Sequence, residues 1–195
     1  MLLIVLTIAI LIIRNSRFRR KKLVSIFVAF FSMAIITIFS IFPAENLFAT
    51  YKTPESVFNY ANSGTITEII HGENSCMVIY SNGNNAYGHY IIPKTDKGYK
   101  IPSYFTSKKI SHKFDKSGLF DIYNVCNTKD YYVFGTVHLK EYNEIYVLNG
   151  NGDKIKSNIF IIENTDFIYF YLPDFSNEHC LSINGEIVLI SNNTG

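Results

Sequence analysis

The three cysteines are the most reactive side chains in the sequence, and their spacing indicates little chemistry. Cys76, Cys126 and Cys180 lie far apart, and an odd number of thiols cannot pair completely within one chain. A structural zinc site would need closely spaced ligands such as C-x-x-C, which does not occur. We therefore expect three small buried hydrophobic groups, and the alternative is one disulfide with a leftover thiol.

The five histidines are also scattered, and they form no H-x-x-x-H or H-E-x-x-H motif. A metal ion needs three or four ligands that converge, and single histidines in strands or turns do not provide them. We expect no metal site and no cofactor. The histidines are His71, His89, His112, His138 and His179.

Motifs for nucleophilic catalysis and for phosphate binding are missing too. The sequence contains no G-x-S-x-G, no P-loop and no G-x-G-x-x-G. Residues 149–153, NGNGD, lie between two apolar runs and predict a hairpin loop, because the spaced carboxylates of a calcium loop are missing. Any Ser/His/Asp or Cys/His set would have to assemble from distant positions, so the sequence identifies no catalytic residue.

Positive charge is concentrated in one short segment, residues 14–22, RNSRFRRKK, which contains no acidic residue. The other 12 cationic residues, all Lys, face 16 acidic residues that begin at Glu45, so residues 44–195 carry −4 although the chain carries +2. A nucleic-acid-binding domain would carry its basic surface on the folded part, so we expect no nucleic-acid partner. The six cations of the segment are Arg14, Arg17, Arg19, Arg20, Lys21 and Lys22.

Apolar runs flank this basic segment on both sides. Residues 23–43 hold no charged side chain, and at about 1.5 Å per residue they are long enough for a transmembrane helix that ends near Pro43. Residues 1–13 are as apolar but shorter. We expect them to form a first spanning or deeply inserted helix, with a half-inserted segment as the alternative.

The basic segment predicts the orientation, because Lys and Arg are enriched on the cytoplasmic side of membrane helices. The six cations are therefore the topology-determining residues, and residues 44–195 lie outside the cytoplasm whether or not residues 1–13 span. A cleaved signal peptide is the less favoured interpretation, because residues 23–43 exceed a usual signal core. Phe42 and Leu47 also stand where a cleavage site needs a small residue. We expect a multi-pass or single-pass protein of the cell membrane.

A linker, residues 44–52, leads to a predicted extracytoplasmic domain, residues 53–195. The domain opens with a helix signal over residues 54–61, where Thr53 is the expected N-cap and a proline occupies the first helical position. The spacing predicts that Val57, Phe58 and Ala61 form the buried edge of this helix.

Short strand-like runs separated by turn sequences follow the helix. Without helices between them, they predict a mainly β domain, an antiparallel sandwich or meander with one short N-terminal helix. Asn184 and Gly185 predict a two-residue hairpin, because both tolerate positive φ. The runs are 65–72, 76–81, 87–93, 99–102, 108–114, 120–126, 131–139, 144–149, 154–162, 166–173, 180–184 and 186–190.

Alternation within these runs predicts the core. In residues 131–139, for example, Val133 and Val137 share one face with Tyr131, while Tyr132 and Phe134 share the other. The predicted core residues are Phe58, Ile79, Ile92, Val133, Val137, Val147, Phe160, Phe170 and Val188.

Four segments in series carry a resemblance to a known group of proteins: KTPESVFNY, IPKTDKGYKIPSYF, GLFDIYNV and KDYYVF. Over about residues 50–190 the chain resembles small, uncharacterised membrane-anchored proteins of low-GC Gram-positive bacteria. The resemblance implies an extracytoplasmic domain behind an N-terminal anchor, and it brings no activity and no catalytic residue with it.

Two classes of function are compatible with the sequence. The first is a non-catalytic binding or interaction module at the outer face of the membrane, with an accessory, sensing or immunity role. Besides the lipid bilayer, its partner would be another membrane protein, a secreted protein or a peptide. The alternative is a cell-surface enzyme, for example a hydrolase, whose site assembles only in the fold. The missing motifs and the small size favour the first class, and a histidine paired with a carboxylate in a cleft would favour the second.

Overall fold

The computed structural model describes residues 19–83, 86–116, 118–137, 144–162, 165–176 and 178–191. The chain divides into two compact units, Met1–Phe48 and Ala49–Gly195. Residues 1–13 and the cations Arg14 and Arg17 lie outside the described residues, so their predicted roles remain predictions.

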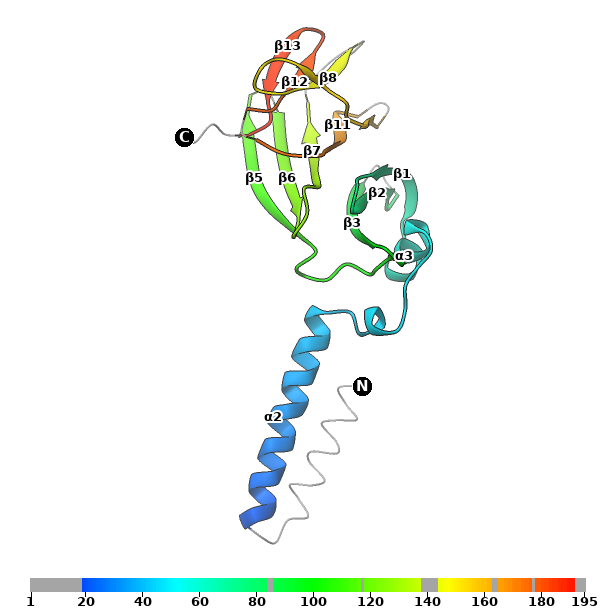
Figure 1. The fold of residues 1–195 in the computed structure, drawn as a ribbon, viewed down its shortest axis with the longest axis vertical. Helices are drawn as coiled ribbons and strands as arrows, with labels where there is room; N and C mark the ends of the chain where they lie inside the picture. Colours follow the sequence, from blue (N-terminus) through cyan, green and yellow to red (C-terminus); the bar gives the residue numbers. More distant parts are fainter. Residues whose placement is uncertain are drawn as a thin grey trace. The chain divides into compact units, whose positions relative to one another are not determined.

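The N-terminal unit contains helix α2 (Arg19–Ile41) and the short 3-10 helix η1 (Ala44–Leu47), with Pro43 between them (Figure 1). The remaining four cations of the basic segment form the start of α2. Within the described part of the chain, no helix meets the combined demands of length and hydropathy for crossing a membrane.

The folded unit, Ala49–Gly195, is mainly β, as predicted, and its described residues form one helix ahead of three antiparallel sheets. The first sheet has the order β1-β2-β3-β4 and follows helix α3 (Pro54–Ala61). Its strands are β1 (Thr65–His71), β2 (Ser75–Ser81), β3 (Tyr87–Thr95) and β4 (Gly98–Tyr99).

The second sheet lies in the middle of the unit and has the order β10-β11-β7-β6-β5. Its strands are β5 (Ser107–Asp115), β6 (Gly118–Val125), β7 (Tyr131–Thr136), β10 (Ile159–Ile161) and β11 (Phe167–Leu172). The third sheet has the order β13-β12-β8-β9. Its strands are β8 (Ile145–Leu148), β9 (Lys154–Ile155), β12 (Cys180–Ile183) and β13 (Glu186–Leu189).

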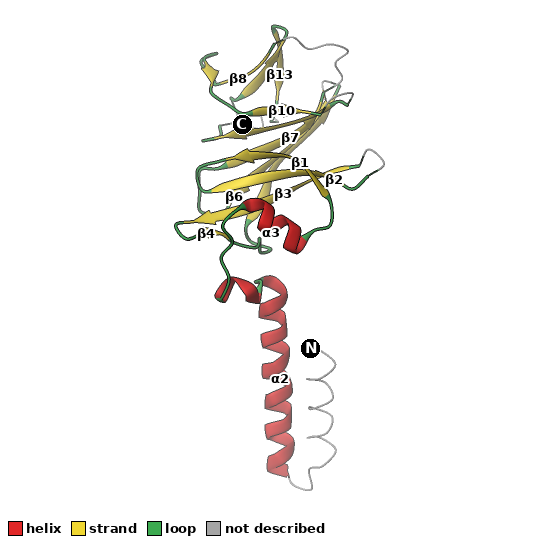
Figure 2. Ribbon diagram, turned by 90° about the vertical axis from the view of Figure 1, so that its right-hand side faces the viewer, coloured by secondary structure: helices red, strands yellow, loops and turns green. Residues whose placement is uncertain are grey.

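Three hydrophobic clusters hold these layers together. Phe58 of α3 packs on the outer face of the first sheet, with Val78 and Ile92. A second cluster joins the first and middle sheets, and a third joins the middle and third sheets. Figure 1 shows α3 on the side of β1–β3 that faces away from β5–β7, and Figure 2 shows the strands of the same layers from another side. The middle sheet is therefore covered on both faces.

The helix prediction is confirmed at both ends. Thr53 is the N-cap, and its Oγ1 accepts a hydrogen bond from the Ser56 amide at 3.3 Å. Val57 and Phe58 are fully buried. The prediction for Ala61 is wrong: it is exposed, because the helix ends there and the chain turns away towards β1.

The hairpin predictions are confirmed as well. Asn184 and Gly185 have φ of 51° and 86°, and they join β12 to β13 with Ile183 opposite Glu186. Residues 149–153 close a hairpin between β8 and β9, where the Asn149 side chain accepts hydrogen bonds from two backbone amides of the loop. The loop is therefore stabilised by its own hydrogen bonds.

Eight of the nine predicted core residues are buried, and Phe160 is only partly buried because β10 is an edge strand. The predicted single strand over 154–162 is also wrong. It is divided into β9 and β10, which belong to different sheets, so residues 156–158 carry the chain from one layer to the next. Of the run 99–102 only Tyr99 belongs to a strand.

Candidate functional site

Asp130 is a fully buried carboxylate (0% exposed) just before β7, where the first and middle sheets meet. Its Oδ2 accepts hydrogen bonds from the amide of Asn74 at 2.8 Å and the hydroxyl of Ser75 at 2.5 Å. Its Oδ1 accepts from the amide of Glu73 at 3.3 Å and the hydroxyl of Tyr171 at 2.9 Å. One carboxylate thus binds the β1–β2 turn to strands of the middle sheet.

The other groups of this network are hydroxyls held in their neutral form. The Ser75 and Tyr132 hydroxyls lie 3.0 Å apart. Burial raises the pKa of both Tyr132 and Tyr171 well above the ordinary tyrosine range, so neither phenol ionises near neutral pH. A buried carboxylate with four donors is a stabilising arrangement, and we interpret this network as the link between two sheets.

A second group of polar side chains lies on the same face of the middle sheet, nearer its β5 edge. The Asp121 carboxylate contacts the imidazole of His112 through Oδ1, 2.5 Å from Nδ1, and the ammonium of Lys109 through Oδ2 at 3.2 Å. His112 and Asp121 are directly opposite each other on β5 and β6. The imidazole side chain is about half-exposed, whereas the carboxylate is mostly buried.

His89 of β3 lies near this pair and is surrounded by aromatic rings. Its ring centroid is 4.9 Å from that of Tyr123 and 5.9 Å from that of Phe134. Burial lowers the pKa of His89, although the nearby Asp121 carboxylate acts in the opposite direction. His89 is therefore neutral at neutral pH and serves as a polar member of an aromatic cluster.

The Asp121–His112 pair is the arrangement in the fold that most resembles catalytic machinery. A carboxylate that orients an imidazole is the arrangement that general-base catalysis uses. No cluster of three or more His, Cys, Asp or Glu side chains in the described ranges has the geometry to hold a metal ion.

All three cysteines are free thiols, so the disulfide alternative is not present in the structure. Cys76 and Cys180 are buried as expected, and Cys126 is only partly buried. Burial raises the pKa of Cys76 to about 12 and also raises that of Cys180, which disfavours the thiolate at both. Neither buried thiol is a suitable nucleophile.

Two of the remaining histidines lie in the described part of the chain, in separate places. His71 is exposed at the end of β1. His179 is buried in a turn, where its Nδ1 accepts a hydrogen bond from the Ser176 amide at 2.8 Å and burial lowers its pKa. His138 lies outside the described residues.

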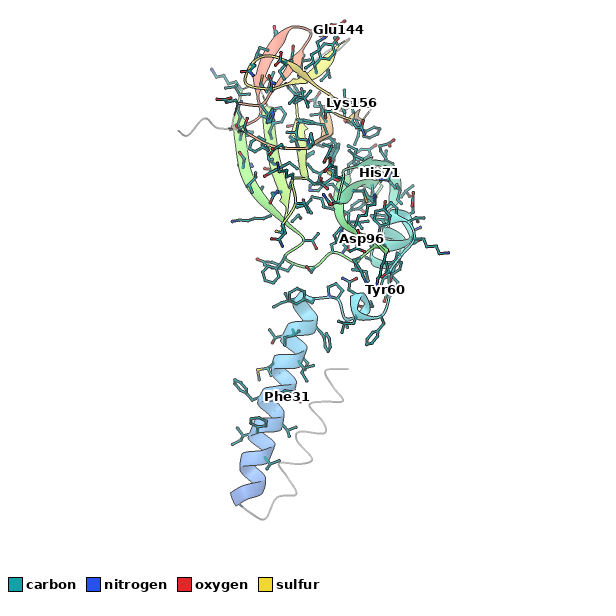
Figure 3. All side chains as sticks on the ribbon, in the orientation of Figure 1. Phe31, Tyr60, His71, Asp96, Glu144 and Lys156 are labelled. Atoms are coloured by element: carbon teal, nitrogen blue, oxygen red, sulfur yellow. The ribbon has the colours of Figure 1, made fainter. Side chains whose placement is uncertain are left out.

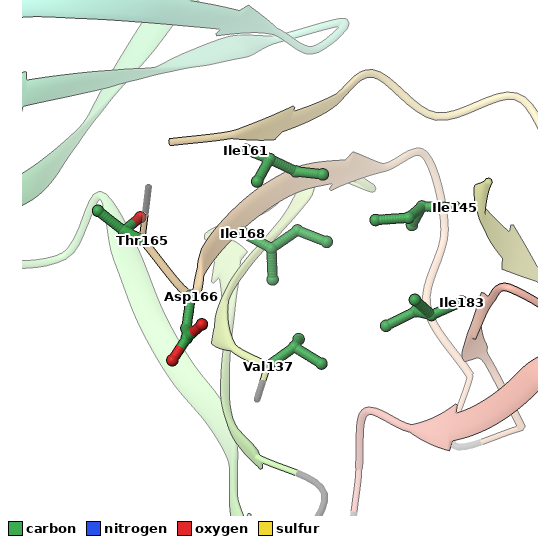
Figure 4. A pocket seen from close by; sticks show the side chains of 7 residues that line it. All are labelled: Val137, Ile145, Ile161, Thr165, Asp166, Ile168 and Ile183. Carbon is green, nitrogen blue, oxygen red and sulfur yellow. The ribbon is translucent and has the colours of Figure 1, made fainter. Parts of the chain in front are cut away.

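One hollow opens between the middle and third sheets (Figure 4). It has a volume of about 20 Å³, room for a single water molecule. Five of its seven lining residues are Ile or Val, with Thr165 and Asp166 at one side. This hollow is too small for a substrate, and we interpret it as a packing gap.

A larger groove of about 260 Å³ lies between two sheet edges. Strand β1 is one edge of the first sheet and β10 is one edge of the middle sheet, and no described strand pairs with either edge. We call this feature the edge groove. It is lined by Glu68, Ile69, Ile70, Asn158, Ile159 and Phe160.

The edge groove combines two kinds of surface. Ile70 and Phe160 belong to the cluster that joins the first and middle sheets, so the floor of the groove is apolar. Glu68 and Asn158 are exposed and polar. The strand β1 carries a bulge between Ile66 and Glu68, and the regular stretch after this bulge is the one that lines the groove.

Comparison with known proteins gave no match: no family model fits the chain, and neither curated proteins nor solved structures show significant similarity to it.

Sequence reasoning identified neither the Asp130 network nor the Asp121–His112 pair. Both have a partial signal, because each aspartate interrupts or adjoins a run of apolar and aromatic residues that pairs within a sheet. A charge in such a position must be paired when it is buried. The partners, however, come from strands that are distant in sequence, and only the fold brings them together.

Proposed function

We propose that this protein is a membrane-anchored binding module that presents its folded unit outside the cytoplasm and takes an extended peptide segment into the edge groove. This function belongs to the first of the two functional classes that are compatible with the sequence, a non-catalytic binding module. The edge groove is the single observation that carries it.

The surface of α2 supports anchorage. Phe27 and Phe30 are 74% and 75% exposed, and large apolar side chains project on opposite sides of the helix (Figure 3). The polar Thr37 satisfies its hydroxyl within the helix, by donating to the Met33 carbonyl at 2.9 Å. Aqueous helices carry a polar face, whereas lipid accepts an apolar surface all round.

Protease accessibility tests the orientation. Protease added to intact protoplasts is expected to digest residues 50–195. Neutral replacements of all six cations in residues 14–22 are expected to weaken the preference for this orientation. A folded unit that stays protected until the membrane is lysed would contradict the proposed orientation.

Edge strands explain why the groove suits a peptide. The outer edges of β1 and β10 leave backbone N–H and C=O groups that no described strand satisfies, and an added strand would pair with them. Alternate side chains of that strand would point to the apolar floor at Ile70 and Phe160, while the others face solvent. Backbone pairing supplies affinity, and the floor supplies selectivity.

Selection from a library of random linear peptides tests this proposal. The folded unit is expected to enrich peptides that lose binding when alternate residues are N-methylated, because each methyl group removes one backbone donor. Asn158→Trp should fill the groove and abolish binding.

Charge reversal at two different sheet edges distinguishes peptide binding in the groove from peptide binding to any exposed strand edge. Glu68→Lys is expected to change which peptides are enriched, whereas Glu186→Lys on β13, an exposed residue of another sheet edge, should not. Equal enrichment by wild type and by Asn158→Trp would contradict peptide binding at this groove.

The Asp121–His112 pair favours a second candidate, a cell-surface hydrolase. Turnover of chromogenic ester, phosphate or glycoside substrates by the wild type, lost in His112→Gln and kept in His71→Gln, would support it. No turnover across that panel would contradict it.

A further inference from the structure

The turn between β4 and β5 exposes two neighbouring aromatic side chains. Tyr104 is 81% exposed and Phe105 is 53% exposed, and their ring centroids lie 5.3 Å apart with the planes nearly perpendicular. Adjacent large aromatic groups on a surface indicate contact with an apolar partner. We call residues 103–106 the aromatic turn.

The aromatic turn has a fixed shape. The Thr106 amide donates to the Ser103 carbonyl at 3.0 Å, and the Ser103 amide donates to the Thr106 hydroxyl at 2.7 Å. The Thr106 carbonyl in turn accepts from the Cys126 amide at 2.9 Å, which joins the turn to the end of β6. The two rings are thus held at the tip of a structured turn.

The chain enters the folded unit close to the start of this loop. Tyr51 and Tyr99 form an antiparallel bridge with two backbone hydrogen bonds, of 2.9 and 2.8 Å. The Lys100 ammonium donates to the carbonyl of Ala49 at 2.7 Å. The entry point therefore lies against residues 99–100, only a few residues before Tyr104.

The tether between α2 and the folded unit is short. Residues 42–48 separate Ile41 from Ala49, and four of them form η1. With about 2 Å of rise per residue in η1 and about 3.5 Å elsewhere, the tether spans no more than about 22 Å. Leu47 and Phe48 within it are 70% and 91% exposed. If α2 is embedded in a membrane, the entry point cannot move far from the lipid surface.

We propose that the aromatic turn docks into the interfacial region of the same bilayer that holds α2. This inference rests on the proposed anchorage and goes beyond it, because it assigns a second, lipid-facing surface to the folded unit. Tyrosine is enriched at this depth of a membrane, where its ring contacts acyl chains and its hydroxyl meets headgroups. The exposed Lys108 ammonium, two residues beyond the turn, suits the phosphate of a lipid headgroup.

The chain contains no tryptophan, so a single introduced indole reports from one place. Full-length Phe105→Trp would be reconstituted in vesicles of phosphatidylcholine and phosphatidylglycerol, with or without bromine on the acyl chains near the headgroup. Ile187→Trp on β13, where the native side chain is 57% exposed, is the matched control. Brominated lipid is expected to remove about half of the emission of Phe105→Trp and to leave that of Ile187→Trp unchanged.

Adding Tyr104→Ser to Phe105→Trp should reduce this quenching, because one of the two docking rings is lost. Tyr104→Trp replaces Phe105→Trp as the reporter if the latter does not fold.

A flotation assay on the same vesicles separates the two proposals. Protein that floats with the vesicles but shows no quenching at either position would overturn docking and leave anchorage intact. A blue shift without quenching would place the turn against a second copy and also overturn docking. Protein that does not float would overturn the anchorage and docking together.

Discussion

The two faces of the middle sheet are built from the same strands and have opposite chemistry. Towards the third sheet the strands present mostly hydrocarbon, including Phe120, Ile122, Val133 and Phe170, and we call this side the hydrocarbon face. Its edge strand β5 adds the buried Lys113, whose ammonium donates to the Leu189 carbonyl of β13 at 2.6 Å. Towards the first sheet the alternate positions present tyrosines and the buried carboxylates of Asp121 and Asp130. Period-two alternation thus sorts one set of strands into a mainly apolar face and a face with a buried carboxylate network.

The difference shows how each contact is stabilised. The hydrocarbon face is stabilised by the area it removes from water, and it tolerates small shifts of one sheet over the other. The polar face is stabilised by directed bonds around Asp130, so the first sheet has one permitted position. Because the edge groove lies between β1 and β10, the Asp130 network also positions the two edges that form it.

Charge placed in the hydrocarbon face should have the largest effect. Val133 is fully buried, so Val133→Asp is expected to destabilise the folded unit by about 4 kcal/mol or more, because the new carboxylate has no partner. Val137→Asp, beside the small hollow, should also be severe but cost less. Chemical denaturation of residues 49–195 measures both, and far-UV circular dichroism should show a mainly β spectrum. A Val133→Asp variant as stable as wild type would mean that this face is not buried.

Removing the carboxylate of the polar face should have the next largest effect. Asp130→Ala is expected to cost about 3 kcal/mol, because it leaves the buried hydroxyls of Ser75 and Tyr171 without this acceptor and removes the acceptor of two part-buried backbone amides. Asp130→Asn keeps one oxygen and should cost less. Urea titration measures the stability of both variants. If Asp130→Asn is less stable than Asp130→Ala, the network does not depend on acceptors at this position.

A close approach of the backbone sharpens the same comparison. A Cβ on Gly72 would lie 2.7 Å from the Tyr132 hydroxyl and 2.9 Å from Asp130 Oδ2. Gly72→Ala is therefore expected to cost about 2 kcal/mol, since the network must open to admit a methyl group. Gly83→Ala is a control for a glycine with nothing within 4 Å of that position, although its positive φ adds a backbone cost. A cost for Gly72→Ala no greater than that of Gly83→Ala would contradict close packing at the turn.

Single hydroxyls should have the smallest effects on stability. Tyr171→Phe removes the bond to Asp130 and is expected to cost about 1.5 kcal/mol. Tyr169→Phe on the same strand is the matched control, because the Tyr169 hydroxyl makes no hydrogen bond to the described residues and its loss should be nearly neutral. Equal costs for the two variants, measured by thermal unfolding, would remove the special role of the Asp130 network.

The polar face should also respond to pH through His89. Its folded pKa lies below the ordinary histidine value of about 6.5, so the folded state binds fewer protons than the unfolded state. The stability associated with neutral His89 is present above about pH 6.5 and is lost as the pH falls through the lower folded pKa. The stability of His89→Phe should therefore fall less between pH 7 and pH 5 than that of wild type. Parallel pH profiles would contradict burial of this imidazole.

The hydrocarbon face was predictable from the sequence, and the polar face was not. Val133, Phe170 and their neighbours lie in strands whose alternation predicts a core. The helix at Thr53 and the hairpin at Asn184 follow from local capping and turn chemistry, which do not depend on the rest of the fold. Each of these features is determined by residues that lie within a few positions of it in the sequence.

The candidate sites depend on contacts that local sequence does not encode. Asp130 meets Asn74 and Ser75 across a separation of more than 50 residues. The edge groove exists because residues 154–162, which alternate like one strand, cross from the third sheet to the middle sheet. Which edge remains unpaired is a property of the whole topology, and a strand pattern gives no information about it.

Amide hydrogen exchange with a selected peptide tests the central claim most directly. A library peptide that binds the folded unit is expected to slow exchange at residues 68–70 and 158–160, the two sides of the edge groove, and to leave β13 unchanged. Protection that appears instead around His112 and Asp121, or that leaves both sides of the groove unchanged, would contradict the proposed binding mode.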